Sequence, residues 1–445
     1  MKKRSGIILA ALLASACANQ TDGAVQRVNP QAAAGEIPAG VSQISPETAT
    51  LVDGNTAFAV DLYKELNSKQ DGNIFVSPAS ISTAFGLAYA GAVGETQEEI
   101  ARVLHFDALA PDVFHPAMGA LMSGLEINIG DEDNEEVPGA RLSINNALWV
   151  DKLTVLEEPY AAQMAEHYGA GDYRVDYRRN PDGARKTINR WVEEKTEDRI
   201  KNLLAKPNVT DETRSILINT IYMNADWRVP FTMAATTDED FRRLDGRKIE
   251  TSMMRNVGHY RHWQDRKLQI LEMPYHGDLS MVVLLPKKKD GLPALEKSLS
   301  AQSVNKSLSN LEQAKQVEVD LKFPKLKLRT RYPMVSEKIL PNLGMTRALS
   351  NAADFSAAVR AERQPDGYPL KIGEVVHQTF LEVDEKGTEA AAATAIASVA
   401  ITSARVGSPP PPPIPFFADH PFLFLIKDNK TGMILFMGRI MEPAQ

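Results

Sequence analysis

The chain has 445 residues, of which 43% are hydrophobic and 24% charged, and its net charge is −7 at neutral pH. This composition is typical of a globular protein with a full core, and the mild acidity argues against a nucleic-acid-binding surface. The single cysteine, Cys17, excludes an intrachain disulfide.

The N-terminus has the parts of a secretory signal. A basic stretch, Lys2–Arg4, is followed by an apolar run, Ile7–Leu13, and by small residues that end at Cys17. The apolar run is too short to span a bilayer. A cysteine directly after small residues resembles a bacterial lipoprotein signal, in which the cysteine becomes the lipidated N-terminus. The resemblance implies a signal peptide over residues 1–16 and lipidation of Cys17; an ordinary cleaved signal is the alternative.

Residues 17–45 form a predicted flexible tether. They are polar and are broken by prolines and glycines, and a coil of this length spans about 30 Å on average. We expect the lipid to anchor the protein to a membrane that the chain does not cross, with residues 46–445 as one folded domain. Because Ala18 rather than aspartate follows the cysteine, the expected destination in a Gram-negative cell is the outer membrane, on its periplasmic face or at the cell surface.

Elements of both types are mixed along the folded part. Residues 142–150 alternate like a half-buried strand. Residues 188–204 carry apolar side chains at helical spacing, with charges between them. Residues 281–286 form an apolar run stopped by proline, which is typical of a buried strand. Near the C-terminus, two apolar runs within residues 422–437 flank a turn signal and predict a β-hairpin.

The segment from residue 387 to residue 408 is the most informative part of the chain. It contains no proline, whereas residues 409–413 are five consecutive prolines, which are excluded from central strands. With strand periodicity, Thr388 and the even-numbered residues would share one face and Glu389 the other. The small residues that open the segment are Gly387, Thr388, Glu389, Ala390, Ala391, Ala392, Ala393 and Thr394. An alanine-rich helix or a low-complexity linker is the alternative, because alanine has the highest helix propensity.

Motifs spread over nearly 400 residues resemble, in their order and spacing, those of the serpin family. The matching segments are residues 73–81, 189–196, 219–231, 343–356 and 420–439. The stretch 387–394 resembles the hinge of the reactive loop with which serpins trap proteases. One departure is the segment 405–417, which is longer than usual and proline-rich.

The resemblance implies an α+β serpin fold of about nine helices and three β-sheets, with an exposed reactive-centre loop. In this family a protease attacks the loop and forms an acyl-enzyme, and the loop then inserts into the central sheet before deacylation. The chain is therefore expected to be an inhibitor and not an enzyme. It would be a monomeric, extracellular suicide substrate of a serine, or alternatively a cysteine, endopeptidase, and it would insert residues 387–401. A non-inhibitory binding or structural protein is the alternative, but the small, uncharged inserting face favours inhibition.

The resemblance also assigns roles to particular residues. Residues 387–394 are the hinge. A polar cluster beneath the centre of the sheet, called the shutter, consists of Ser77, Ser80, Asn219 and His377. Trp227 belongs to the breach, where the hinge first enters the sheet. Taken alone, His377 or Trp227 would be an ordinary core residue.

In the family the scissile bond follows the hinge at a set distance, which implies Ile401–Thr402, fourteen residues after Gly387. The aliphatic residues before this bond suit apolar or small primary pockets, so the expected targets are elastase-like or subtilisin-like serine proteases. A shift of one or two residues is an alternative. So is a cut after Arg405 by a trypsin-like enzyme, which needs a cation to pair with its buried carboxylate.

No catalytic or metal-binding motif competes with this interpretation. The chain has no Gly-x-Ser-x-Gly elbow, no His-Glu-x-x-His, no Cys-x-x-Cys and no phosphate-binding glycine loop. His259 and His262 are spaced for one helix face, but no third ligand is near them in the sequence. We therefore expect neither a metal site nor a cofactor.

Overall fold

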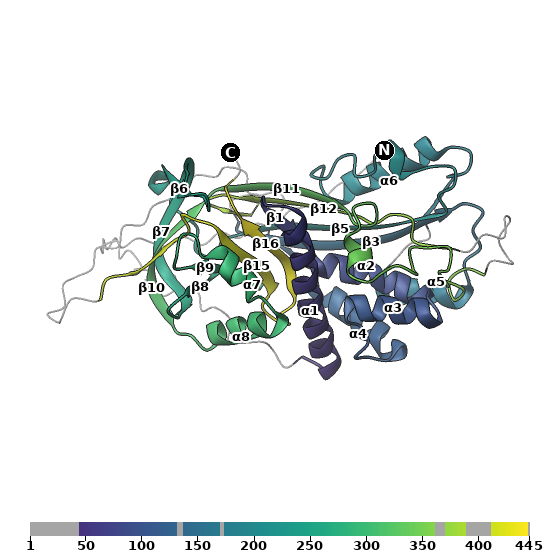
Figure 1. Ribbon diagram of the computed structural model, residues 1–445, viewed down its shortest axis with the longest axis horizontal. Helices are drawn as coiled ribbons and strands as arrows, with labels where there is room; N and C mark the ends of the chain where they lie inside the picture. The colour runs from purple at the N-terminus through teal and green to yellow at the C-terminus, as the bar shows by residue number, and fades with distance from the viewer. Residues whose placement is uncertain (1–43, 131–136, 170–172, 361–369, 389–410, 444–445) are drawn as a thin grey trace, which may run out of the picture. The chain divides into compact units, whose positions relative to one another are not determined.

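The computed structural model describes residues 44–130, 137–169, 173–360, 370–388 and 411–443. Within these ranges the α-helices are α1 (Pro46–Lys69), α2 (Pro78–Gly91), α3 (Gly94–Leu104), α4 (Pro111–Leu125), α5 (Glu158–Tyr168), α6 (Pro181–Lys195), α7 (Leu292–Lys297), α8 (Ala301–Glu312) and α9 (Ile339–Asn342) (Figure 1). Three of them begin with a proline directly after a capping residue, Ser45, Ser77 or Asn180. Proline fits this position because an N–H there would have no partner within the helix. The side chain of the preceding capping residue accepts a hydrogen bond from another backbone N–H of the first turn.

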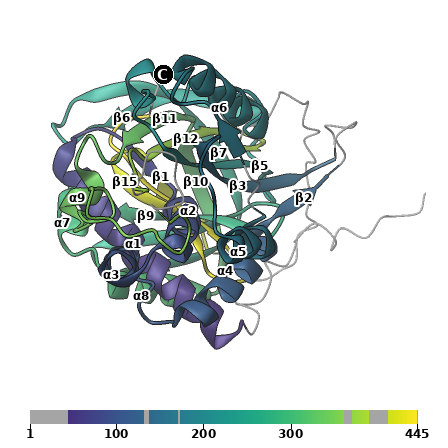
Figure 2. The same cartoon turned by 90° about the vertical axis from the view of Figure 1, so that its right-hand side faces the viewer.

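One sheet, called the central sheet below, runs in the order β11–β12–β13–β5–β3–β2, with β4 paired to β3. Its strands are β2 (Ile127–Ile129), β3 (Ala140–Asp151), β4 (Tyr173–Val175), β5 (Ser215–Asp226), β11 (Leu326–Pro333), β12 (Val376–Val383) and β13 (Gly387–Thr388). Helix α6 covers one face of this sheet, and helices α2, α4 and α5 lie on the other side (Figures 1 and 2). Both faces of the sheet are therefore partly covered, although the edge strands β11 and β2 keep exposed residues.

The second sheet runs β1–β16–β15–β9–β8–β7–β10–β14, with β6 paired to β7. Its strands are β1 (Ile74–Val76), β6 (Thr237–Arg242), β7 (Lys248–Gln264), β8 (Leu268–Pro274), β9 (Leu279–Pro286), β10 (Gln316–Pro324), β14 (Ile414–Phe417), β15 (Phe422–Asp428) and β16 (Ile434–Ile440). The 17-residue β7 pairs with β6 through its first part and with β8 through its last residues. The resemblance implies three sheets. Because β7 runs without a break from one of them into another, the described residues form two sheets.

Three elements predicted from the sequence are confirmed. Residues 142–150 lie within β3, and residues 281–286 within β9, which is buried along its whole length. The predicted C-terminal hairpin consists of β15 and β16, paired antiparallel. The continuous apolar run of β9 thus reflects a strand with both faces in the core, as in a sheet covered on two sides.

The helix predicted over residues 188–204 is correct only in its first part. Helix α6 ends at Lys195, where the Thr196 hydroxyl donates to the carbonyl of Val192 at 2.7 Å and accepts from the N–H of Ile200 at 3.2 Å. Three of the residues that follow have positive φ angles, namely Glu197, Asp198 and Asn202. The apolar residues of this segment are buried under the helix, so the spacing predicted their burial correctly but not their backbone conformation.

In the described part of the chain, no helix is long and apolar enough to cross a lipid bilayer.

Candidate functional site

A tight turn at the end of β12 precedes the predicted hinge, residues 387–394. The N–H of Asp384 donates to the carbonyl of Gly387 at 2.9 Å, and the Asp384 carboxylate accepts from the N–H groups of Lys386 and Gly387 at 2.9 and 3.1 Å. Burial raises the pKa of Asp384, although these N–H groups favour its charged form. The side chain therefore fixes the chain reversal that starts the loop.

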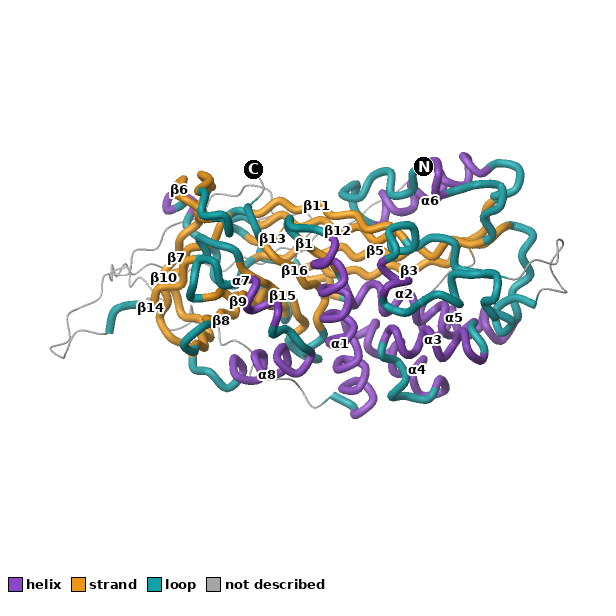
Figure 3. Tube along the Cα trace, viewed as in Figure 1, coloured by secondary structure: helices purple, strands orange, loops and turns teal. Residues whose placement is uncertain are grey.

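Strand β13, formed by Gly387 and Thr388, already lies between β5 and β12. Gly387 pairs with Asp226 and Thr388 with Ala225 on β5, while Thr388 also pairs with Val383 on β12. A Cβ atom at Gly387 would clash with the Ala225 carbonyl oxygen, so only glycine fits this close approach. Figure 3 places β13 at the end of the central sheet that is nearest to β6 and β7.

Thr388 points into the core, as the period-two pattern predicted for this position. Its side chain is 2% exposed, and its hydroxyl lies 2.7 Å from the hydroxyl of Tyr275. The ring of Tyr275 stacks on Trp227 with a centroid distance of 4.0 Å. Thr388 thus occupies a closed apolar site with one polar partner.

Trp227 binds the turn directly. Its indole N–H donates to the carbonyl of Asp384 at 3.0 Å, and its backbone N–H donates to the carbonyl of Lys386 at 2.7 Å. The structure therefore brings this residue to the point where the hinge enters the sheet, and its role there remains a prediction.

An ion pair with a buried carboxylate also holds the turn, and the sequence analysis did not identify it. Glu385 is 6% exposed; its carboxylate lies 2.8 Å from the ammonium group of Lys325 and accepts from the Thr236 hydroxyl at 2.7 Å. Burial opposes the charge, but the hydrogen bonds from Lys325 and Thr236 outweigh it and lower the pKa of Glu385. Nothing in the sequence signals a contact between residues sixty positions apart.

Lys325→Ala is expected to destabilise the protein at neutral pH by about 1–3 kcal/mol, because it leaves the Glu385 carboxylate buried without its cation; the lower part of the range allows for the half-exposed lysine. Because the pKa of Glu385 is lowered in the folded protein, the ion pair contributes its full stabilisation above the ordinary glutamate pKa. This stabilisation is lost as the pH falls from there through the lowered pKa. The difference from the wild type should therefore shrink at acid pH.

Urea unfolding midpoints at neutral and acid pH measure this effect. Lys327→Ala is the matched control, because Lys327, two residues further along on β11, pairs with the more exposed Glu382. Equal losses for the two variants at neutral pH would contradict a special role of Lys325.

The facing edges of β5 and β12 form what we call the seam. Among the described residues, no ladder joins the two strands directly: β13 separates them at one end, and a single bridge between Leu217 and Val375 joins them at the other. Beyond this bridge, the Ser215 hydroxyl donates to the carbonyl of Lys371 at 3.4 Å. The seam thus has room for a strand at β13 and closes at the bridge.

Three of the four predicted shutter residues lie together. The Ser77 hydroxyl donates to the Leu435 carbonyl at 2.6 Å and accepts from the N–H of Ser80 at 3.2 Å, while the Ser77 N–H donates to Nε2 of His377 at 3.0 Å. Burial lowers the pKa of His377 to about 3, so the ring is neutral and Nε2 can accept. The Ser80 hydroxyl is buried without a partner among the described residues.

The fourth predicted shutter residue, Asn219, lies on β5 with its backbone opposite Asn146 of β3; its side chain is outside the description. The remaining predicted site residues, Glu389–Thr394, Ile401, Thr402 and Cys17, also lie outside the described residues.

Residues 196–209, called the strap, cross the outer face of the central sheet after α6. Glu197 accepts a hydrogen bond from the Tyr222 hydroxyl on β5 at 2.9 Å. Arg199 lies 6.0 Å from the ring centroid of Phe380 on β12. On the edge strand, Arg331 donates to the Leu203 carbonyl at 3.2 Å. The strap therefore contacts both sides of the seam.

Comparison with known proteins gives consistent similarities. Residues 53–443 match the family Serpin (serine protease inhibitor). The chain is 33% identical to human Serpin B3 over 403 residues, which cover 88% of this chain and all of that protein. It is 34% identical to the leukocyte elastase inhibitor of Sus scrofa over 399 residues, 87% of this chain and 98% of that one. The solved structure of uncleaved ovalbumin is similar with a TM-score of 0.75 and 28% identity, over 88% of this chain and 100% of ovalbumin.

Proposed function

The chain belongs to the serpin family, and on this premise we propose that it is an inhibitory serpin. It would act as a suicide substrate of a serine, or alternatively a cysteine, endopeptidase and trap the acyl-enzyme by inserting residues 387–401 into the seam. The observation that carries the proposal is the placement of Gly387 and Thr388 between β5 and β12, where a strand has begun and the next residues are small. Residues 46–445 would form the inhibitory domain.

Strand completion supplies the energy for this mechanism. About ten new backbone hydrogen bonds, at roughly 1 kcal/mol net each, would match the whole stability of an ordinary domain, about 5–15 kcal/mol. The inserted strand, at about 3.3 Å per residue, would be about 45 Å long. Insertion could thus carry an attached protease from one end of the sheet to the other before the ester is hydrolysed.

The two ladders of β13 fix the register of further insertion. Counting residue by residue from the pairing of Thr388 with Ala225 puts position 396 opposite Leu217 on β5. Counting from the pairing of Thr388 with Val383 puts the same position opposite Val375, which directly precedes β12. Leu217 and Val375 now bridge each other. The two registers agree, and they require this bridge to separate when position 396 arrives.

The same register supports Ile401–Thr402 as the scissile bond. Position 398 would lie opposite Ser215, the first residue of β5. Cleavage after Ile401 then leaves residues 399–401 to reach the attached protease, whereas cleavage after Arg405 would leave residues 399–405. The longer connection would relax the pull on the protease, so the shorter one favours trapping.

The residues before this bond, Val399, Ala400 and Ile401, are aliphatic. They suit a protease with an apolar or small primary pocket, so we propose an elastase-like or subtilisin-like serine protease as the target. The name of the porcine relative, leukocyte elastase inhibitor, agrees with this class.

The decisive experiment is incubation of the purified protein with an elastase and with subtilisin, followed by denaturing electrophoresis. We expect a band that survives boiling in SDS and has the summed mass of the inhibitor and protease. A protease with a blocked active-site serine should give no such band. Complete cleavage without any complex, by every serine and cysteine protease tried, would favour the non-inhibitory alternative.

The C-terminal peptide released from that complex identifies the scissile bond. Its mass should correspond to a fragment that begins at Thr402, and mass spectrometry measures this directly. A fragment from a stable complex that begins at Val406 would overturn both the assigned bond and the proposed class of protease.

We further propose that residues 1–16 are a lipoprotein signal and that Cys17 carries lipid, with the outer membrane of a Gram-negative cell as the destination. The support is the order of basic, apolar and small residues before the single cysteine. Cys17→Ser should leave the precursor unprocessed or release the protein from the membrane fraction. Fractionation followed by immunoblotting measures this, and unaltered membrane retention with normal processing would contradict the lipid anchor.

A further inference from the structure

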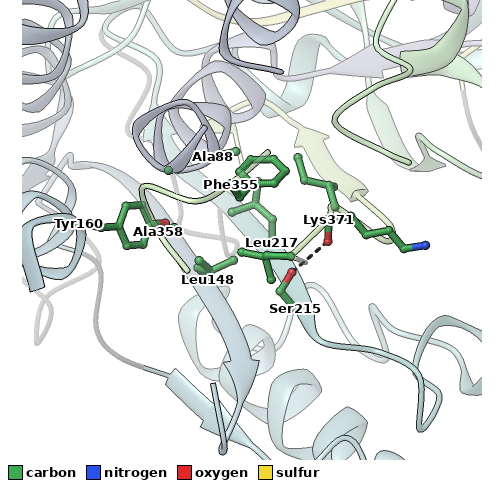
Figure 4. A pocket seen from close by; sticks show the side chains of 11 residues that line it. Ala88, Leu148, Tyr160, Ser215, Leu217, Phe355, Ala358 and Lys371 are labelled. Atoms are coloured by element: carbon green, nitrogen blue, oxygen red, sulfur yellow. Dashed lines mark hydrogen bonds between the residues drawn. The ribbon is translucent and has the colours of Figure 1, made fainter. Parts of the chain in front are cut away.

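An apolar pocket lies where the seam closes (Figure 4). Leu217 of β5 and Leu148 of β3 form one side of it, and Tyr160 of α5, Phe355 and Leu370 line the rest. Its cavity volume is about 20 Å³. The hydrogen bond from Ser215 to the Lys371 carbonyl runs along its edge. The pocket is thus next to the contacts that an inserting strand must break.

The lining suits a hydrocarbon group better than water. A buried water needs two to four polar partners, whereas this pocket offers mainly apolar side chains. Poorly filled space in a core costs dispersion contacts. A branched aliphatic side chain that entered here would recover those contacts and displace little bound water.

The chain has one side chain of this kind at the matching position. Thr388 points into the core, and strand periodicity gives the same direction to every second residue after it. The residues at these positions are Thr388, Ala390, Ala392, Thr394, Ile396 and Ser398. Ile396 is the single large apolar residue of the series, and its register position is opposite Leu217, which lines the pocket.

We propose that this pocket receives the side chain of Ile396 when the reactive loop inserts, and that its burial offsets the loss of the Leu217–Val375 bridge. The inference rests on the proposed inhibitory function. It separates insertion into two stages: residues up to 394 enter a seam that is already unpaired, and Ile396 opens the closed end.

The test compares loop-cleaved proteins, so that contacts with the protease do not affect the measured melting temperature. Each variant is cleaved in the loop and melted in a fixed concentration of guanidinium chloride. We expect cleaved Ile396→Ala to melt about 3–5 °C below the cleaved wild type, and Ile396→Val to lose less. The uncleaved variants should have the same melting temperature as the uncleaved wild type. Val399→Ala is the matched control, because position 399 lies beyond β5 and faces the other way.

A second variant approaches the pocket from the opposite side. Ala88 of α2 lines it, and Ala88→Leu should fill it without changing the loop. This variant should lower the melting temperature of the cleaved form relative to the wild type while keeping the uncleaved form at least as stable.

The outcomes distinguish the two proposals. If cleavage does not stabilise the wild type at all, the inhibitory function itself fails. If cleavage stabilises the wild type and Ile396→Ala equally, only the pocket assignment is overturned.

Discussion

Thr388→Arg should convert the inhibitor into a substrate. Thr388 is almost fully buried between β5 and β12, beside the stacked rings of Trp227 and Tyr275. No carboxylate lies among these contacts, and an unpaired guanidinium in such a site costs several kcal/mol. The arginine would therefore hold the hinge out of the sheet, and deacylation would overtake insertion.

The measurement is the ratio of SDS-stable complex to cleaved inhibitor at increasing inhibitor-to-protease ratios. We expect the stoichiometry of inhibition to rise at least about tenfold, since every 1.4 kcal/mol in competing barriers is a factor of ten. Glu389→Arg is the control, because strand periodicity turns position 389 away from the core; it should retain inhibition. Wild-type stoichiometry for Thr388→Arg would show that the hinge does not insert.

Cleavage of the reactive loop should raise the melting temperature sharply. The freed segment can then pair with both edges of the seam, and its new hydrogen bonds add about 10 kcal/mol. For a domain of this size, such a gain corresponds to a rise of the order of 10 °C or more. Most proteins are destabilised by a chain cut, so even the direction of this change is diagnostic.

Differential scanning calorimetry before and after limited proteolysis near residue 401 measures the change. Cleaved Thr388→Arg provides the internal control and should show a smaller rise. An unchanged melting temperature after complete cleavage of the wild type would favour the non-inhibitory alternative.

The sequence predicted those features that depend on local patterns. Alternation and apolar runs identified β3, β9 and the C-terminal hairpin because each strand shows its burial in its own residues. The hinge over residues 387–394 was assigned through the family resemblance and stays a prediction, although the strand periodicity agrees with the burial of Thr388. The sequence did not predict the end of α6 correctly, because the buried Leu203 and Leu204 keep a helical spacing in a segment that is not helical.

Contacts between distant segments could not be predicted in this way. The partners of the predicted hinge and its turn, Lys325 and Tyr275, lie just outside strands, between β10 and β11 and directly after β8, and neither has an unusual sequence environment. The union of two expected sheets through β7 depends on pairings along its whole length. Such features require the fold itself, whereas the family resemblance supplied only the positions that match its motifs.

The strap sets a limit on the size of the residues that can pass beneath it. If the proposed insertion continues the register of β13, position 391 would lie opposite both Tyr222 and Phe380, the residues that the strap contacts on the two sides of the seam. In an inserted strand the odd-numbered positions would face the strap, and residues 391, 393, 395 and 397 are all alanine. The proposed insertion would thus pass short alanine side chains beneath the strap. Two constraints act on one segment: the core face requires apolar or small groups, and the strap requires short ones on the other face.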